Sequence, residues 1–253
     1  MKRSTLYYSL AAVLLYCLFL VSNLPASQAW QWFSPKLQDV RLQGIEGTIW
    51  SGHAAQLTVR GIPLGKAAWR IFPLQLLLGH LAVKWHYQNG SGSGEGILRV
   101  AYNGDIRAGK THMESDLTIL RSLLPQMPVM LAGEVKLDIT SAEIHQGMLT
   151  ELTGGADWLG GRTVSPVESD IGSFHAVFST QKQAIQAIQA KLSDVSGPLS
   201  MQGILRLQPK GGYSFIADLK PRAGASAALL DALQQIARPS ANGGFTLEYR
   251  GQL

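Results

Sequence analysis

The sequence predicts a mainly β protein: a single N-terminal transmembrane helix followed by a curved antiparallel β-sheet domain with a few short helices. Three observations support this fold class. Residues 5–24 form an uncharged, mostly apolar run, apolar and polar residues alternate with period two over much of 39–253, and glycine-rich turn signals separate the alternating segments. The 46% hydrophobic and 15% charged content excludes a disordered chain.

The apolar run predicts a membrane anchor. From Thr5 to Leu24 a helix spans about 30 Å, the thickness of a bilayer core. Lys2 and Arg3 precede the run, so we expect residues 1–4 in the cytoplasm and the bulk of the chain on the other side of the cell inner membrane. The alternative is a signal peptide cleaved after the small residues near Ser27 and Ala29, which leaves the bulk in the same compartment.

Residues 39–253 read as a β-rich domain that follows a linker over 25–38. Leu98, Val100 and Tyr102 alternate with polar residues, as do Tyr213 and Phe215 further on, which is typical of strands with one covered face. We expect about ten antiparallel strands, arranged in two sheet segments that meet near 125–130.

Few helices are expected. Residues 226–237 carry leucines and an isoleucine on one helical face, 73–79 begin with proline and end with glycine, and 115–124 form a short candidate. Residues 183–192 fit both periods, and we favour a strand there because strands flank the segment.

Charge and cysteine content limit the function. The net charge of +5 comes from scattered cations, so we expect no nucleic-acid partner. Cys17 is the only cysteine, which excludes an intrachain disulfide and a cysteine metal site.

One segment resembles a nucleotide-binding loop. Residues 104–111 match GxxxxGK[ST], in which backbone amides cradle phosphates and the lysine, here Lys110, reaches the terminal ones. Such loops follow a buried parallel strand, whereas residues 97–103 include Arg99 and Asn103. We therefore expect a hairpin turn around Gly104, with Lys110 in solvent.

No pattern of catalytic residues stands out. The six histidines lie six to thirty-three residues apart, without an HExxH spacing, and no serine lies in a GxSxG motif. We expect no enzyme, cofactor or metal, although a triad assembled from distant positions is the alternative that spacing does not test.

Glycine and tryptophan carry the most specific pattern. The sequence has GTIWSG at 47–52, W-x-x-x-P-x-x-L-L-x-G at 69–79 and a second glycine-preceded tryptophan at Trp158. With the N-terminal run and the closing GGFTLEYRGQL, this succession resembles the type II secretion system protein N family along essentially the whole chain. The residues that carry the resemblance are Gly47, Trp50, Gly52, Trp69, Pro73, Gly79, Gly133, Trp158, Gly197 and Gly203.

The resemblance implies an accessory structural component of the type II secretion system, which exports folded periplasmic proteins across the outer membrane of Gram-negative bacteria. It implies a periplasmic β-domain and, as partners, the inner-membrane platform, the pseudopilus and the secretin. We interpret the signature residues as structural, with glycines that bend the sheet and the Trp50 indole covering the bend. The alternative function is a periplasmic lipid-binding or lipid-bridging groove, which requires a continuous apolar face.

Overall fold

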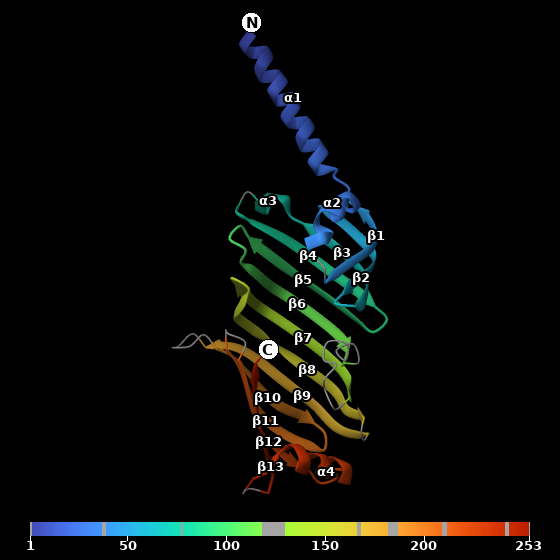
Figure 1. Ribbon diagram of the computed structural model, residues 1–253, viewed down its shortest axis with the longest axis vertical. Coiled ribbons are helices and arrows are strands. Elements are labelled where there is room, and N and C mark those ends of the chain that lie inside the picture. Colours follow the sequence, from blue (N-terminus) through green and yellow to red (C-terminus); the bar gives the residue numbers. More distant parts are fainter. Residues whose placement is uncertain are drawn as a thin grey trace. The chain divides into compact units, whose positions relative to one another are not determined.

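The computed structural model describes residues 2–36, 39–76, 78–117, 130–165, 168–181, 187–208, 212–240 and 243–252. The chain divides into two compact units, unit 1 over Met1–Asn89 and unit 2 over Gly90–Leu253. Both are built mainly of antiparallel strands (Figure 1).

Unit 1 begins with helical segments and continues as a four-stranded sheet. The helical segments are α1 (Lys2–Ser22), α2 (Ala26–Phe33) and the 3-10 turn η1 (Ser34–Lys36). The strands pair in chain order and are β1 (Val40–Gly47), β2 (Ser51–Val59), β3 (Ile62–Ile71) and β4 (His80–Asn89), with the one-turn helix α3 (Pro73–Leu76) between the last two.

The prediction that the N-terminal helix spans a membrane is wrong. Among the described residues, no helix combines the length and the apolar character needed to cross a membrane. Helix α1 ends at Ser22, two residues before the predicted limit, and Tyr7, Tyr8 and Ser9 interrupt its apolar surface. The mainly β, antiparallel character is confirmed.

Unit 2 contains ten strands among its described residues, and each pairs antiparallel with its neighbours in the order β5-β6-β7-β8-β9-β10-β11-β12-β14-β13. The strands are β5 (Gly92–Ala101), β6 (Ile106–Asp116), β7 (Met130–His145), β8 (Met148–Ser165), β9 (Ser169–Gln181), β10 (Ala187–Ser196), β11 (Leu199–Leu207), β12 (Gly212–Pro221), β13 (Arg238–Pro239) and β14 (Phe245–Gln252). Helix α4 (Ala227–Ile236) lies between β12 and β13 in sequence.

The sheet of unit 2 has one mostly polar and one mostly apolar face, because side chains alternate along each strand and directly paired residues share a face. One row of paired positions is polar from β6 to β14: Glu114, Lys136, Asp157, His175, Ser193, Gln202, Asp218 and Thr246. The adjacent row is apolar: Met113, Leu137, Ala156, Ala176, Leu192, Gly203, Ala217 and Leu247. The period-two pattern of the sequence therefore becomes an amphipathic sheet.

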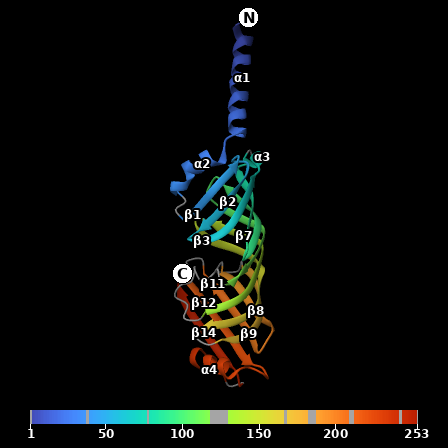
Figure 2. The same ribbon diagram turned by 90° about the vertical axis from the view of Figure 1, so that its right-hand side faces the viewer.

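Helix α4 covers part of the apolar face and closes the main core of unit 2 (Figure 2). Ser226 caps its N-terminus, since its side chain accepts a hydrogen bond from the Leu229 backbone N–H. Leu229 and Leu233 face inward, only 4% and 3% exposed. They join a cluster with Phe174, Leu199, Ala217, Leu219 and Ala237.

The other helix predictions have mixed outcomes. Helices are present within 226–237 and 73–79. Of the strand favoured over 183–192, residues 187–192 belong to β10, and residues 182–186 lie outside the described part. In 115–124, β6 continues to Asp116, and the residues from 118 lie outside the described part. The predicted meeting of two sheet segments near 125–130 also falls there, apart from Met130.

Candidate functional site

The GTIWSG segment forms a tight connection between β1 and β2. Gly47 pairs with Gly52 and has a φ of +90°, a conformation that favours glycine. A Cβ on Gly52 would lie 2.6 Å from the Trp69 ring and 2.6 Å from the Glu46 carbonyl oxygen. The Trp69 indole N–H donates to the Ile49 carbonyl oxygen at 3.2 Å. The ring that covers Gly52 is therefore Trp69 of β3.

Trp50 has a different contact from the one expected. Its indole N–H donates to the Val21 carbonyl oxygen at the end of α1, at 2.8 Å. Its side chain therefore links the β1–β2 connection to the N-terminal helix of the same unit. Pro73 is the first residue of α3, and Gly79 follows that helix with a φ of +85° and donates to the Leu76 carbonyl oxygen.

A second glycine-tryptophan contact occurs in unit 2, between β7 and β8. Gly133 has a φ of +131°, and a Cβ there would lie 2.6 Å from the Trp158 indole nitrogen and 2.7 Å from the Leu159 carbonyl oxygen. The Trp158 N–H donates to the Ala132 carbonyl oxygen at 3.3 Å. The ring also packs against Phe174, with centroids 5.5 Å apart. The indole is thus hydrogen-bonded and packed by its own unit.

The remaining signature glycines allow close backbone approach. A Cβ on Gly197 would lie 2.3 Å from the Gly172 Cα, so only glycine fits where β9 meets the β10–β11 turn. Gly203 lies in β11, where a Cβ would be 3.0 Å from the Ala217 Cβ. The structure brings the signature residues into separate contacts, and none of those described here forms a shared catalytic cluster.

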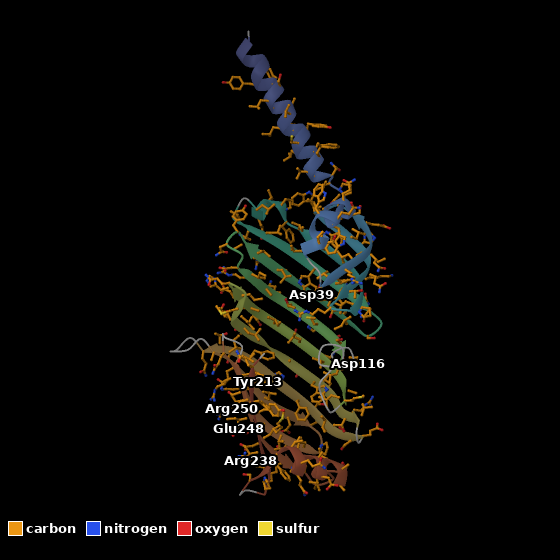
Figure 3. All side chains as sticks on the ribbon, viewed as in Figure 1. Asp39, Asp116, Tyr213, Arg238, Glu248 and Arg250 are labelled. Carbon is orange, nitrogen blue, oxygen red and sulfur yellow. The ribbon has the colours of Figure 1, made fainter. Side chains whose placement is uncertain are left out.

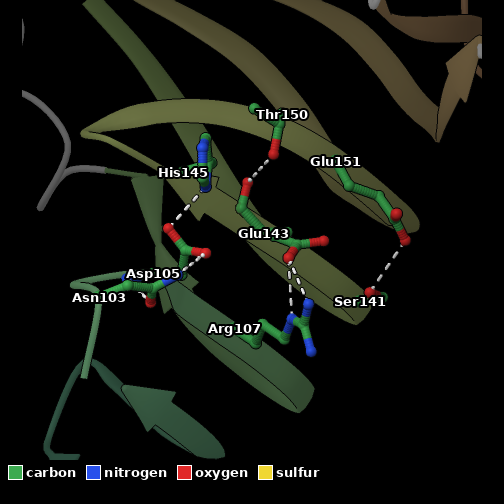
Figure 4. Close-up of polar contacts among 8 residues, drawn as sticks. All are labelled: Asn103, Asp105, Arg107, Ser141, Glu143, His145, Thr150 and Glu151. Atoms are coloured by element: carbon green, nitrogen blue, oxygen red, sulfur yellow. Dashed lines mark hydrogen bonds and ion pairs between the residues drawn. The ribbon is translucent and has the colours of Figure 1, made fainter. Parts of the chain in front are cut away.

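The residues that match the nucleotide-loop pattern, 104–111, form the end of a hairpin turn and the first part of β6 (Figure 4). Residues 102–104 form the turn between β5 and β6, and Lys110 lies exposed in β6. Asp105 contacts His145 at 2.6 Å, and Arg107 forms an ion pair with Glu143 at 2.8 Å. The hydrogen bond to Glu143 raises the pKa of Arg107. The predicted hairpin is present, and its side chains bind the neighbouring strand.

Sequence spacing did not reveal three histidine-aspartate pairs in unit 2. His112 contacts Asp138, His175 contacts Asp157 and His145 contacts Asp105, each at 2.6 Å. The first two pairs join adjacent strands. Such pairs can be identified only when the neighbouring strands and the register between them are known. The three histidine side chains are between 39% and 48% exposed, so these are surface contacts, which contribute little to stability.

The electrostatics of this polar face favour pairing. The hydrogen bond to Asp138 raises the pKa of His112, and a further hydrogen bond to Glu114 acts in the same direction. The hydrogen bond from Lys136 lowers the pKa of Glu114 and raises that of Lys136. Charges of opposite sign therefore alternate across β6 and β7. Within the described ranges, no group of three or more His, Cys, Asp or Glu residues is placed to hold a metal ion.

The fold and these contacts define a β-sheet protein whose prominent glycines and tryptophans shape its own backbone. Comparison with known proteins places it more closely. The family described as type II secretion system (T2SS), protein N, matches residues 38–248. The chain belongs to this family.

Relatives match along the full length of the chain. The type II secretion system protein N of Vibrio cholerae serotype O1 is 26% identical over 257 residues, which cover 100% of each chain. That of Aeromonas hydrophila is 25% identical over 258 residues, again with 100% of each chain covered. That of Klebsiella pneumoniae is 27% identical over 256 residues, which cover 99% of this chain and 96% of the relative. No solved structure matches the chain.

Family membership confirms the predicted resemblance and the function that follows from it. The protein is an accessory component of the type II secretion system and takes part in protein transport. Membership also implies interaction with other components of that system.

Proposed function

We propose that the protein is a periplasmic scaffold at the cell inner membrane, without catalytic activity, nucleotide or nucleic acid. The observation that carries this proposal is how the indole rings of two signature tryptophans are hydrogen-bonded and packed. Trp69 and Trp158 each donate to a backbone carbonyl of their own unit and lie against a glycine where a Cβ would clash. An indole whose N–H donates to a backbone carbonyl of the same unit stabilises the shape of the sheet and has no free donor for a substrate.

The partners we propose are the inner-membrane platform, the pseudopilus and the secretin. Their support is family membership, which implies contacts within the secretion system. Large antiparallel sheets supply extended surfaces and strand edges, both of which serve protein assembly.

A scaffold and an enzyme respond differently to changes at Trp158. Trp158→Phe keeps most of the ring but removes the hydrogen bond to Ala132, whereas Trp158→Ala also removes the packing on Phe174. For a scaffold, secretion should fall in proportion to the remaining folded protein in both variants. Quantitative blots beside assays of secreted protein test this. A well-folded Trp158→Phe protein present at normal amount but inactive in secretion would contradict the proposal.

Lipid binding is the second candidate, favoured by the apolar face of unit 2. Beside the apolar row described above, a second row is also largely apolar: Ile139, Gly154, Phe178, Ala190, Leu205, Phe215 and Tyr249. Leu137 and Phe178 are only partly buried, so acyl chains would find apolar surface there.

Mass spectrometry of lipids retained by residues 30–253 after gel filtration separates the two functions. A lipid carrier should retain phospholipid stoichiometrically, and Phe178→Asp should release it without unfolding the sheet. Retention no greater than that of an unrelated protein of similar charge excludes the carrier. Stoichiometric retention excludes a purely structural role.

A further inference from the structure

The outer edge of β14 is open along most of its length. On one side β14 pairs with β12 at every position from Phe245 to Gln252. On the other side it pairs with β13 at Phe245 and Thr246 alone. In the described part of the chain, no strand pairs with residues 247–252 on this side. Every second one of these residues therefore points its backbone N–H and C=O outward, and such an edge readily accepts another strand.

The side chains along this open edge alternate in character. Glu248 and Arg250 point to one face of the sheet and are joined at 2.5 Å. Leu247 and Tyr249 point to the opposite face, and Tyr249 is 62% exposed. Figure 3 shows Glu248 and Arg250 following one another along this margin of unit 2, between Tyr213 and Arg238. The edge thus offers opposite charges on one face and an aromatic ring on the other.

We propose that β14 pairs antiparallel with β14 of a second copy of this chain, with the two Tyr249 residues opposite each other at a two-fold axis. In this register Glu248 faces Arg250 of the second copy, and Arg250 faces Glu248 of the second copy. Both cross-strand pairs are then between opposite charges, which is the favourable arrangement. An isologous contact of this kind closes after two copies.

The position of β13 and the charges along the edge together select this register. Because β13 occupies the edge at Phe245 and Thr246, an incoming strand finds free backbone only from Leu247 onward. The symmetric pairing of residues 247–251 with the same residues of a second copy is centred on Tyr249. Moving the two-fold axis to Glu248 would leave only residues 247–249 free of β13 and would place the two glutamates opposite each other. Moving it to Arg250 would place the two arginines opposite each other.

Apolar contacts complete the interface at both ends. In the same register Leu247 of the second copy lies opposite Gly251. A Cβ on Gly251 would be 2.5 Å from the Tyr213 hydroxyl, so the Tyr213 side chain of β12 lies over this glycine. The incoming leucine therefore meets an aromatic ring. Both the charge pairs and this contact are complementary between two copies of the same strand, which favours a second copy over a partner of unrelated sequence.

Crosslinking of the full-length protein in cells tests the register. In a Cys17→Ser background, Tyr249→Cys should give a crosslinked dimer with a short bismaleimide, because directly opposite residues are about 5 Å apart. Val177→Cys is the control, since Val177 lies in β9 and is 46% exposed. At least about tenfold more dimer is expected for Tyr249→Cys. Equal yields would overturn the proposal, as would a product that contains a different protein.

A charge-swap series tests the pairing itself. Glu248→Arg alone, or Arg250→Glu alone, places like charges opposite each other twice and should weaken dimerisation of the purified full-length protein about tenfold. The double variant Glu248→Arg/Arg250→Glu restores both pairs and should recover the dimer within about threefold. Thermal unfolding checks that all three fold. A monomeric wild-type protein, or a double variant as weak as the single ones, would refute the two-fold register.

Discussion

At the residue scale, two glycines of unit 2 show how backbone conformation and close contact restrict a position to glycine. Gly133 and Gly147 both have positive φ, but a Cβ at Gly133 meets Trp158 and Leu159, whereas one at Gly147 meets nothing within 4 Å. Gly133 also has a φ of +131°, further from the left-handed region than the +79° of Gly147, so alanine at Gly133 meets both a contact and a larger backbone strain.

We predict that Gly133→Ala lowers the free energy of unfolding by about 3 kcal/mol and Gly147→Ala by about 1 kcal/mol. The larger loss arises because the Trp158 indole must move away from Ala132 and because a φ of +131° is more strained for alanine than one of +79°. Urea unfolding of both variants measures the difference. Equal losses at the two glycines would show that the Trp158 contact contributes little.

Lys110 provides a second test at this scale. It lies exposed in β6 with a φ of +49°, where glycine is more favourable than any other residue. Lys110→Ala should change the free energy of unfolding by less than about 0.5 kcal/mol and leave secretion intact, while Lys110→Gly should stabilise by up to about 1 kcal/mol. Calorimetry and a secretion assay check this, and ATP binding to the purified wild-type protein would contradict it.

At the scale of elements, α4 shows how a short helix is held by burial. Leu233 is 3% exposed within the core, and Ile236, the last residue of the helix, is 60% exposed. Leu233→Ala should cost about 2 to 5 kcal/mol through the cavity it leaves, and Ile236→Ala should cost less than about 0.5 kcal/mol. Chemical denaturation of both variants gives the comparison. Similar costs would mean that α4 is not packed as described.

The pairing of β6 with β7 should depend on pH through His112. Its hydrogen bond to Asp138 raises its pKa above the ordinary 6.5, so the folded state binds the proton more tightly than the unfolded chain does. This contribution is fully present below pH 6.5 and is lost as the pH rises through the raised pKa. It is small, because the His112 side chain is 46% exposed.

We expect His112→Gln to destabilise the protein more at about pH 5.5 than at about pH 8.5. Urea unfolding at both values measures this, and an NMR titration of His112 follows the proton directly. In Asp138→Asn the pKa of His112 should fall. A wild-type pKa at or below 6.5 would contradict the assigned hydrogen bond.

At the scale of the whole molecule, a labelling experiment tests in which cellular compartment the sheet lies. Ala223 is exposed in the turn between β12 and α4, and Cys17 is the only native cysteine. In a Cys17→Ser background, Ala223→Cys should react with a membrane-impermeant maleimide in intact spheroplasts, because we propose a periplasmic sheet. Cytoplasmic proteins serve as the unlabelled control, and labelling only after lysis would place the sheet in the cytoplasm.

The sequence by itself determined the antiparallel β architecture, the positions of α3 and α4 and the family. These follow from period-two alternation, from capping residues and from motifs, all of which are local or nearly so. It also indicated that the GxxxxGK[ST] segment is a hairpin, because its neighbouring strand is amphipathic. Its prediction of a membrane-spanning helix was wrong, since no described helix reaches the required apolar length.

Only the tertiary structure decided which residues meet. Trp69 rather than Trp50 covers Gly52, Trp158 reaches Ala132, and the histidines find aspartates across strands. The open edge of β14 likewise depends on where β13 ends. Alternation assigns a side chain to a face of a strand, but the register between strands is set by bulges, turns and packing over long separations. Contacts across strands therefore require the folded sheet.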